Sequence, residues 1–452
     1  METVKRIIDE IASVSGVKEK KAIIKRYEDN ALFNRVVKYA LDQDRSYDLT
    51  DLPEPVTEPS PVHRGTIFSI LDSMAEKKGT TMEEAQELSD ACGPGSAREV
   101  VLKILRKDLR CGARAKVFNG VKKGWVYEVP YQRYKSFSSI HKIDFSRGTV
   151  VAQLKMDGQF AYLFTARGED YFLSRNGSTF DLGPEFRKVI DNSWLPLVDA
   201  TIGEPTVRMG ELLVMGPDGR YLPRKEGNGI INSFISGKGD PGRVKDIHYV
   251  TWGFITEMEY EARVSKRSYQ DTILLDSQCA SGGGQIKLSE TTQVNSLEEA
   301  MEFYRAARKR DEEGAMVKEA DKLFWKDQQS GTPYGVKLKP EAEAEFEIVE
   351  AYCGDKGKKW EKHLGGLVVK TSCGKLVSRL GNGFSDKERL LGVDWWNDHK
   401  GKIVTGRFTG ITTDKTNRET MCLDHGRFVE TRFHDKTEAD TLEYCIKEVK
   451  KV

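Results

Sequence analysis

The segment Lys155–Gly158 (K-M-D-G) has residue types and an order that could carry out phosphoryl chemistry. It lies between two runs of β-forming residues, Thr149–Leu154 and Phe160–Phe164, so Lys155 is expected to project from a tight turn between strands. A lysine amine attacks phosphorus only in its neutral form, which partial burial beside other cations favours. Taken alone, these four residues are more often an ordinary surface hairpin.

Four further segments follow this lysine in order along the chain. They are Ser174–Gly177 (S-R-N-G), Gly210–Leu212 (G-E-L), Glu313–Lys318 (E-G-A-M-V-K) and Val336–Lys339 (V-K-L-K). In order and spacing, the five segments resemble the motifs of the covalent nucleotidyltransferases, the superfamily that contains polynucleotide ligases and capping enzymes. The resemblance implies that the first lysine forms a covalent bond to a nucleotide.

The same resemblance implies ATP as the cofactor and assigns roles that suit each side chain. Lys155 would attack the α-phosphorus of ATP and expel pyrophosphate. Lys337 and Lys339 would neutralise charge that develops on the α-phosphate oxygens. Arg175 would offer a bidentate contact to a phosphate of the nucleotide or of the nucleic acid.

Acidic residues of the motifs are expected to serve a metal ion and the nucleotide. Glu211 and Glu313 supply hard oxygen ligands for Mg²⁺, directly or through water, and Glu211 could also accept a hydrogen bond from the ribose. Asp157 would orient the lysine, although an Asp before Gly is also a common turn former. Lys318, at the end of the fourth motif, is expected to contact the nucleotide.

The adenine base requires an aromatic surface and a polar group that reads its edge. Trp252 lies in a segment, Thr251–Phe254 (T-W-G-F), that resembles the family's aromatic motif, and we predict that it stacks on the base, with Phe254 as the substitute. An aromatic residue in a strand is more often part of a core than a surface for a cofactor. Gln153, two residues before the lysine, holds a position from which family members read the base.

Two places depart from the family pattern. Phe160 stands where most members carry an arginine, so one cationic contact must be supplied elsewhere or lost. The segment Arg432–Lys436 (R-F-H-D-K) resembles the sixth motif, R-x-D-K, but its arginine is one residue too far from Asp435. Lys436 is therefore expected to help position the departing pyrophosphate, and Arg432 is left open.

Segments outside the nucleotide motifs indicate the substrate. Asp9–Ser13, Arg106–Ala113, Gly381–Phe384 and Asp435–Thr441 resemble bacteriophage-type ATP-dependent DNA ligases, so the resemblance covers nearly the whole chain. It implies a multidomain protein that seals nicks in duplex DNA during replication, repair and recombination. The expected layout is an all-α DNA-binding domain at 1–130, an α+β adenylyltransferase domain with an ATP-grasp-like nucleotidyltransferase fold at 131–340, and an all-β OB-fold domain at 341–452.

Local patterns agree with this order of fold classes. Apolar residues recur at helical spacing early in the chain, and S/T-x-x-E pairs at Thr80–Glu83, Ser96–Glu99 and Ser296–Glu299 predict helix starts. After residue 145 short β-forming runs dominate, and after residue 341 they are separated by Gly-rich turns that predict a small barrel. The stretch Gly216–Arg243, rich in glycine and charge, is predicted to be a long mobile loop.

Charge and composition restrict the class of protein. The 452 residues have a formal net charge of +1, yet residues 97–145 carry twelve Lys or Arg against four Asp or Glu. Such a block is either a solvated face or a phosphate-binding surface that does not read sequence. From it we predict DNA contacts by four basic residues: Arg106, Arg110, Arg114 and Lys116.

The remaining features concern location and partners. No stretch is apolar enough for a membrane span or a signal peptide, so a cytoplasmic monomer is expected, in the host cytoplasm if the protein is viral. The seven cysteines include no C-x-x-C pair and are predicted to be free, mostly buried thiols, which disfavours the zinc-containing NAD-dependent ligases. Nicked duplex DNA is the expected partner, and the sequence identifies no replication clamp partner.

Two other classes of protein share parts of this pattern. A capping guanylyltransferase or an RNA ligase would use the same lysine chemistry with GTP or on RNA ends. A nick-binding protein with an inactive site would keep the basic helices without forming a nucleotide adduct.

Overall fold

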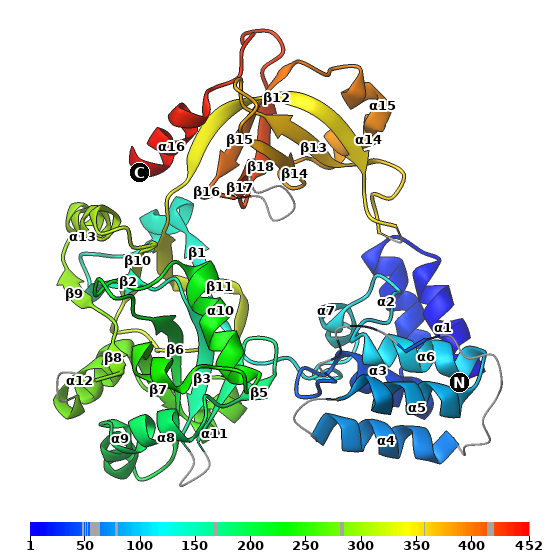
Figure 1. The fold of residues 1–452 in the computed structure, drawn as a ribbon, viewed down its shortest axis with the longest axis horizontal. Coiled ribbons are helices and arrows are strands. Elements are labelled where there is room, and N and C mark those ends of the chain that lie inside the picture. The colour runs from blue at the N-terminus through cyan, green and yellow to red at the C-terminus, as the bar shows by residue number, and fades with distance from the viewer. Residues whose placement is uncertain are drawn as a thin grey trace.

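Three parts of the protein surround a central opening (Figure 1). The computed structural model describes residues 1–47, 49, 51, 53–54, 64–76, 80–165, 170–280, 284–356, 358–413 and 420–451. Helices occupy the first part, two sheets with covering helices occupy the second, and a smaller β-rich unit forms the third. The predicted combination of helices with mixed sheets is therefore confirmed.

The first part is entirely helical within the described residues. Its helices are α1 (Glu2–Ala12), α2 (Val17–Arg26), α3 (Ala31–Leu41), α4 (Arg64–Glu76), α5 (Met82–Cys92), α6 (Ser96–Leu105) and α7 (Ala115–Asn119). The apolar stripe of α1, formed by Val4, Ile7, Ile8 and Ile11, is fully buried, as its spacing predicts. Such stripes meet in one core that extends to Val126.

Two predicted helix starts are wrong by one residue. Helix α5 begins after Thr81, whose hydroxyl accepts a hydrogen bond from the Glu84 N–H, rather than at Thr80. Both frames of this segment satisfy the S/T-x-x-E pattern, so the pattern alone does not choose between them. Ser96 is the first residue inside α6, and Gly95 precedes the helix in its place.

The central part consists of two sheets. The first has the strand order β1 (Gln132–Ser136), β11 (Gln328–Leu338), β10 (Gly314–Glu319), β2 (Val150–Lys155) and β9 (Thr291–Val294). The second has the order β5 (Thr179–Phe180), β4 (Tyr171–Ser174), β3 (Gln159–Phe164), β6 (Thr206–Val214), β7 (Ile247–Thr256) and β8 (Ile286–Leu288). The associated helices are η1 (Phe137–Lys142), α8 (Pro184–Asp191), α9 (Leu195–Ile202), α10 (Arg224–Ile235), η2 (Pro241–Asp246), α11 (Glu257–Ala262), α12 (Tyr269–Cys279) and α13 (Leu297–Lys309).

Strands β2 and β3 belong to different sheets. β2 pairs with β10 and β9, whereas β3 pairs with β4 and β6. The intervening residues, Met156–Gly158, therefore carry the chain from one sheet to the other. The surface hairpin that these residues would also fit is excluded, because a hairpin requires its two strands to pair with each other.

The predicted long loop at Gly216–Arg243 is wrong, because α10, a helix of 12 residues, lies in the middle of it. Its two interior glycines lower helix propensity and mislead a composition-based interpretation. The helix forms because Ile231 is fully buried, with Ile230 and Phe234 packed around it against the second sheet. Tertiary burial thus outweighs local propensity here. The helix start predicted at Ser296, by contrast, is confirmed, since its side chain accepts from the Glu299 N–H at the start of α13.

The third part is built on a five-stranded antiparallel sheet. Its strand order is β14 (Val377–Leu380), β13 (Leu364–Lys370), β12 (Ala342–Cys353), β15 (Ile403–Phe408) and β18 (Arg427–Thr431), beside a ribbon of β16 (Gly410–Thr413) and β17 (Met421–Asp424). Helices α14 (Asp386–Leu390), α15 (Gly392–Asn397) and α16 (Leu442–Lys451) complete it. The fully buried rings of Phe346 and Trp396 form the centre of its core.

Two expectations drawn from the composition, on membrane spans and on cysteines, can be compared with the structure. In the ranges described above, no helix has the length and apolar character needed to cross a bilayer. None of the seven cysteines forms a disulfide, but only Cys111 and Cys445 are buried. The prediction of mostly buried thiols is therefore wrong, since three of the others are half-buried (Cys92, Cys279 and Cys422) and two are exposed (Cys353 and Cys373).

Candidate active site

Lys155 is the last residue of β2, where the chain leaves the first sheet for the second. Gly158, at the far end of this crossing, lies so close to β6 that an added Cβ atom would stand 2.3 Å from the Leu212 carbonyl oxygen. Its N–H donates a 2.6 Å hydrogen bond to the Glu211 carboxylate. The first and third motifs are thus joined directly, and only glycine fits at position 158.

Glu313 connects two lysines of different motifs. Its Oε2 accepts a hydrogen bond from Lys155, and its Oε1 lies 2.9 Å from the Lys339 ammonium. The strand register supports this arrangement, because Lys155 of β2 stands opposite Gly314 of β10. Gly314 has a φ of +150°, and a Cβ there would stand 2.1 Å from the Leu338 carbonyl oxygen, so the position is reserved for glycine.

The electrostatics of this cluster favour an anion. Burial acts to raise the pKa of Glu313, but Lys155 and Lys339 outweigh it and hold that pKa below its ordinary value. Burial, followed by the positive charges of Lys339 and Lys155, lowers the pKa of Lys337. Three ammonium groups thus share one paired carboxylate, which leaves positive charge to stabilise an incoming phosphate.

Two further carboxylates border the crossing. Burial raises the pKa of Glu211 to about 7, although Lys155 and the Gly158 N–H oppose the shift. Burial also raises the pKa of Asp157, followed by the nearby charge of Glu313. Asp157 lies 3.5 Å from the guanidinium of Arg224 on α10. Arg224 lay in the segment predicted to be a loop, and no local sequence signal identifies it.

The ionisation of Glu211 should make stability depend on pH. Its pKa is about 7 in the folded protein and its ordinary value is 4.5, so the folded state binds this proton more tightly. The stabilisation is present below about pH 4.5 and is lost as pH rises through about 7. Urea unfolding should show the native protein losing stability relative to Glu211→Gln between about pH 5 and pH 8, by about 1.4 kcal/mol for each unit of pKa difference.

The exposed substitution Glu185→Gln on α8 is the control for this measurement. It removes one carboxylate that is 58% exposed and pairs with Lys188, and its pH dependence should match that of the native protein. Equal pH dependence in the native protein and Glu211→Gln would contradict the assignment of the raised pKa to Glu211.

Gln153 lies on β2 in a buried polar network. Its Nε2 donates to the Tyr269 hydroxyl and to Thr291 Oγ1, and its Oε1 accepts a 2.6 Å hydrogen bond from the Lys318 ammonium. Burial lowers the pKa of Lys318 to about 7. Lys318 also lies 4.3 Å from the centre of the Tyr269 ring. The two predicted nucleotide contacts, Gln153 and Lys318, are therefore brought together.

Trp252 lines a pocket of about 170 Å³ together with Gln153. The pairing of β6 with β7 shifts register at Trp252, since Gly210 stands opposite Thr251 and Met209 opposite Gly253. Trp252 is thus the extra residue of a β-bulge, a feature that redirects a side chain. Phe254, the predicted substitute, is instead fully buried in another core cluster beside Arg208, so the structure contradicts that alternative.

Phe160, which stands at the sequence position of the missing family arginine, lies among other aromatic rings. Phe160 contacts Trp252, with ring centres 6.0 Å apart, and Tyr131 edge-on at 5.2 Å. The exposed guanidinium of Arg175 lies 4.3 Å above the centre of the Tyr131 ring. Arg175 and Phe160 therefore both contact the Tyr131 ring, which the sequence does not reveal.

The third part faces the site lysines with residues other than Lys436, the residue that the sequence predicts to act there. A pocket of about 470 Å³ contains Lys337 and Lys339 of the central part with His425 and Arg427 of the third part. Lys436 is exposed, and its N–H donates to the Arg432 carbonyl. Arg432 itself pairs with Glu345 and Asp435, so the extra residue of R-F-H-D-K still permits an Arg–Asp contact.

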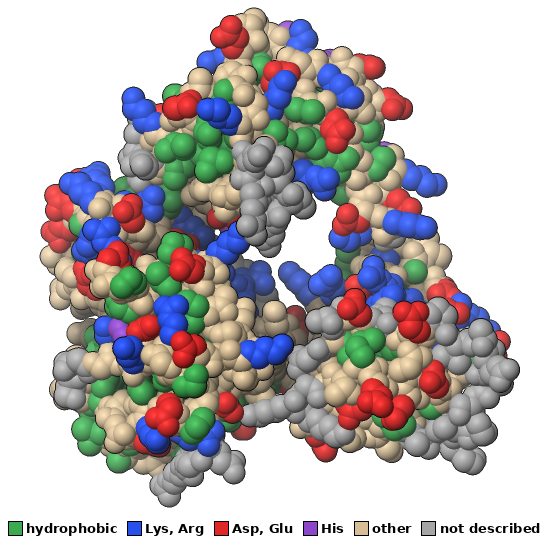
Figure 2. Space-filling model, in the orientation of Figure 1, with side chains coloured by type: hydrophobic (Ala, Val, Ile, Leu, Met, Phe, Trp, Pro, Cys, Tyr) green, Lys and Arg blue, Asp and Glu red, His purple; other side chains and the backbone are tan. Residues whose placement is uncertain are grey.

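The four predicted DNA contacts lie on the helical part. Arg106, Arg110, Arg114 and Lys116 are all exposed. Figure 2 shows Lys and Arg side chains gathered around the central opening, most densely on the helical part.

Two other lysines of the helical part bind backbone carbonyl groups of that part. Lys107 donates to the Asp42 carbonyl at 2.6 Å, and the buried Lys20 donates to the Cys111 carbonyl at 2.6 Å. Lys107 and Lys20 therefore stabilise the fold, whereas the four predicted DNA contacts have exposed side chains that a ligand can reach.

The donor set fits a cation held mainly by phosphates. Among the described residues, no group of three or more His, Cys, Asp or Glu side chains is arranged to hold a metal ion. The charge of Glu313 adds to the burial that raises the pKa of Glu211, and a cation bound beside these carboxylates would oppose that shift. Mg²⁺ commonly binds through one or two carboxylates plus substrate phosphates and water, and two carboxylates beside a phosphate site fit that pattern.

Comparisons with known proteins agree with these observations. No protein-family model matches the chain. It is 24% identical to the DNA ligase of Enterobacteria phage T4 over 97% of both chains, and equally to that of phage T6. Among solved structures it is similar to one named Pmar-Lig_Pre., with a TM-score of 0.70, 19% identity, and 95% of this chain and 99% of the other covered. The chain is thus similar over nearly its whole length to bacteriophage DNA ligases, and the resemblance drawn from its motifs is confirmed.

Proposed function

We propose that this protein is an ATP-dependent DNA ligase that seals nicks bearing a 5′-phosphate and a 3′-hydroxyl. The observation that carries the proposal is the cluster of Lys155, Glu313 and Lys339 at the crossing between two sheets. A lysine held there beside other cations is suited to attack a nucleotide phosphate. Sequence similarity to two phage DNA ligases along nearly the whole chain supports DNA as the substrate.

Each of the three parts would have its own role in the reaction. Residues 1–130 form the proposed DNA-binding domain, 131–340 the adenylyltransferase domain with an ATP-grasp-like nucleotidyltransferase fold, and 341–452 the OB-fold domain. Around the central opening, three linked domains could hold a duplex on both sides of a nick (Figure 2). The exposed basic residues of the helical part would contact phosphates without reading sequence. A monomer in the cytoplasm, of the host if the protein is viral, is sufficient for this activity.

The reaction consists of three phosphoryl or nucleotidyl transfers. In the first, Lys155 Nζ loses a proton and bonds to the α-phosphorus of ATP while the bond to the β-phosphate oxygen breaks, so pyrophosphate leaves. In the second, a 5′-phosphate oxygen of the nick displaces the lysine and accepts AMP. In the third, the 3′-hydroxyl oxygen attacks the 5′-phosphorus, loses its proton, and AMP leaves.

The surrounding residues would stabilise charge in each transfer. Lys337 and Lys339 would bind the α-phosphate oxygens. As the nucleotide enters, Lys155 and Lys339 would exchange their contacts with Glu313 for contacts with its phosphates. Arg175 would bind a phosphate, and Asp157 would hold the crossing through Arg224. Mg²⁺ held by Glu211 and Glu313 would neutralise phosphate charge. Gln153, Lys318 and Trp252 would enclose the base.

Lys436 should be needed for the first transfer but not for the third. In the structure it is exposed on the third part, while His425 and Arg427 face the site lysines, so Lys436 would reach ATP only after that part rotates. Lys436→Ala should slow formation of the lysyl adduct by about 10²-fold, a typical loss for one group that stabilises developing charge. Sealing of nicked DNA that is already adenylylated should stay near the native rate.

Single-turnover kinetics of both steps would measure this, with Lys387→Ala on α14 as the control for loss of an exposed lysine. The rotation would be refuted if Lys436→Ala formed the adduct normally but failed to seal the adenylylated nick.

The proposed function is tested by incubating the protein with α-labelled ATP or GTP and Mg²⁺. An acid-labile labelled band from ATP on a denaturing gel, followed by sealing of nicked DNA in preference to nicked RNA, is the expected result. Label from GTP would indicate a capping guanylyltransferase, sealing of RNA an RNA ligase, and absence of label a nick-binding protein without catalytic activity.

A further inference from the structure

Arg175 projects from a turn whose backbone is held in place. The turn Ser174–Gly177 follows β4, and the Gly177 N–H donates a 3.0 Å hydrogen bond to the Ser174 carbonyl oxygen. Gly177 has a φ of +95°, and an added Cβ atom would stand 1.7 Å from the carbonyl oxygen of Gln43 in the helical part. The turn therefore fits closely against the helical part, and Arg175 extends from a fixed point of the backbone.

The Tyr131 ring is the contact that the structure gives to the Arg175 guanidinium. The guanidinium carbon lies 4.3 Å from the centre of the ring, and no described carboxylate forms an ion pair with it. Phe160 meets the ring edge-on, with ring centres 5.2 Å apart and ring planes at 87°. The Tyr131 N–H donates a 3.1 Å hydrogen bond to Asp327 Oδ1. The ring is thus held both through its own backbone and by Phe160.

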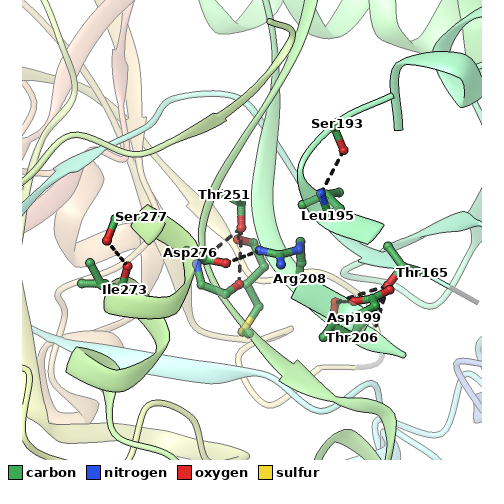
Figure 3. A network of polar contacts seen from close by, with 12 residues as sticks. Thr165, Ser193, Leu195, Asp199, Thr206, Arg208, Thr251, Ile273, Asp276 and Ser277 are labelled. Atoms are coloured by element: carbon green, nitrogen blue, oxygen red, sulfur yellow. Dashed lines mark hydrogen bonds and ion pairs between the residues drawn. The ribbon is translucent and has the colours of Figure 1, made fainter. Parts of the chain in front are cut away.

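A second arginine of the same sheet lies beside aromatic rings for a different reason. The guanidinium of Arg208 on β6 lies 4.5 and 4.9 Å from the ring centres of Trp194 and Phe254. It is fully buried, and its Nη1 lies 2.8 Å from Asp276 Oδ1 (Figure 3). The charge of Arg208 is therefore balanced inside the core. Arg175 is exposed, so its charge is available to an anion that arrives from outside.

The Arg175 side chain stands at the edge of the candidate site. Phe160, which touches the same ring, lies opposite Glu211 in the pairing of β3 with β6. Burial raises the pKa of Tyr131, which the charge of Arg175 opposes and the charge of Glu211 increases. Burial is also the largest cause of the lowered pKa of Lys337, and the charge of Arg175 adds to it. The guanidinium therefore lies within electrostatic range of a lysine that is expected to bind the α-phosphate.

We propose that Tyr131 is a positioning residue whose ring holds the Arg175 guanidinium ready to bind a phosphate at the candidate site. The inference rests on the proposed function and adds to it a residue outside the five motif segments. A guanidinium that lies on a ring is bound through its face, so the N–H groups along its edge stay free for phosphate oxygens. An exposed arginine loses rotamer freedom when it binds a ligand, and the ring imposes part of that loss before the ligand arrives.

The test measures two single-turnover rates: adduct formation with ATP, and sealing of nicked DNA that already carries AMP. Arg175→Gln should slow at least one of them by about 10²-fold, as expected when one donor to developing charge is lost. The rate that falls shows whether the phosphate belongs to the nucleotide or to the nick. Tyr131→Leu should slow the same rate about fivefold, the effect of one exposed cation–π contact. Tyr131→Phe keeps the ring and should stay within about twofold of the native rate.

The double change distinguishes positioning from a structural role. In the Arg175→Gln background there is no guanidinium to hold, so Tyr131→Leu should slow the rate by less than about twofold. The matched control is Tyr171→Leu in β4, which removes a half-buried ring stacked on Phe164, with ring centres 4.8 Å apart. It should change the rate by the same factor with and without Arg175. If Tyr131→Leu does not fold, Tyr131→Met, with an unbranched apolar side chain, replaces it.

Equal slowing by Tyr131→Leu in both backgrounds would show that the ring serves only the fold, and would overturn the inference while leaving the proposed function intact. The same holds if Tyr131→Leu or Arg175→Gln keeps both native rates. Failure of the native protein to form an adduct and to seal the nick would overturn the proposed function and this inference together.

Discussion

Lys155→Arg is expected to form no covalent nucleotide adduct and to seal no unadenylylated nick. The guanidinium keeps its positive charge beside Glu313 but offers no neutral amine to attack phosphorus. Adduct formation should fall by about 10⁴-fold or more, as when a covalent nucleophile is removed. Sealing of nicked DNA that already carries AMP should persist, because the third transfer uses the 3′-hydroxyl as nucleophile.

The matched control is Lys188→Arg on α8, where the lysine pairs with Glu185 and is 65% exposed. It should form the adduct at the native rate. Labelled adduct in Lys155→Arg at more than a trace would show that another residue is the nucleophile.

Removing the four exposed basic residues of the helical part should weaken nick binding about 10³-fold at 0.1 M salt. Each phosphate contact contributes about 0.9 to the slope of log K against log salt, so the loss of four should reduce that slope by about 3.6. The variant carries glutamine at Arg106, Arg110, Arg114 and Lys116, all exposed. Fluorescence anisotropy of a nicked duplex over a salt series measures both quantities.

Adduct formation with ATP should be unaffected in this variant, because the lysyl transfer requires no DNA. The control replaces an equal number of exposed basic residues on the central part: Lys188, Arg305, Lys309 and Arg310. If both sets reduced the salt slope equally, the helical segment would contribute only general charge and not a defined contact surface.

The resemblance of five segments, in order, to the motifs of a known superfamily allowed the residues of the candidate site to be predicted. The resemblance did not predict that the first motif connects strands of two different sheets. A strand, a short Gly turn and a second strand describe both a hairpin and a crossing between sheets, and only the pairing of β2 with β10 distinguishes them. Likewise, the glycine and charge around Arg224 resemble a loop, because local composition does not report the burial of Ile231.

Trp252 and Phe254 show a second limit. Residues two apart on a regular strand share a face, so either could stack on the base. The bulge at Trp252 breaks that alternation and sends Phe254 into the core, and bulges have no reliable sequence signature in a single chain. The orientation of the third part was equally inaccessible, because the sequence of a domain does not state which edge faces its neighbour.

The divided origin of the site has a consequence during synthesis on the ribosome. Lys155 emerges well before Glu313, Lys337 and Lys339, and it leaves β2 at a crossing that exists only once the second sheet has formed. Nascent chains acquire structure from the amino terminus onward. On the proposed function, we therefore expect Lys155 to remain unreactive until translation has passed residue 339, and a shorter product to form no adduct with ATP.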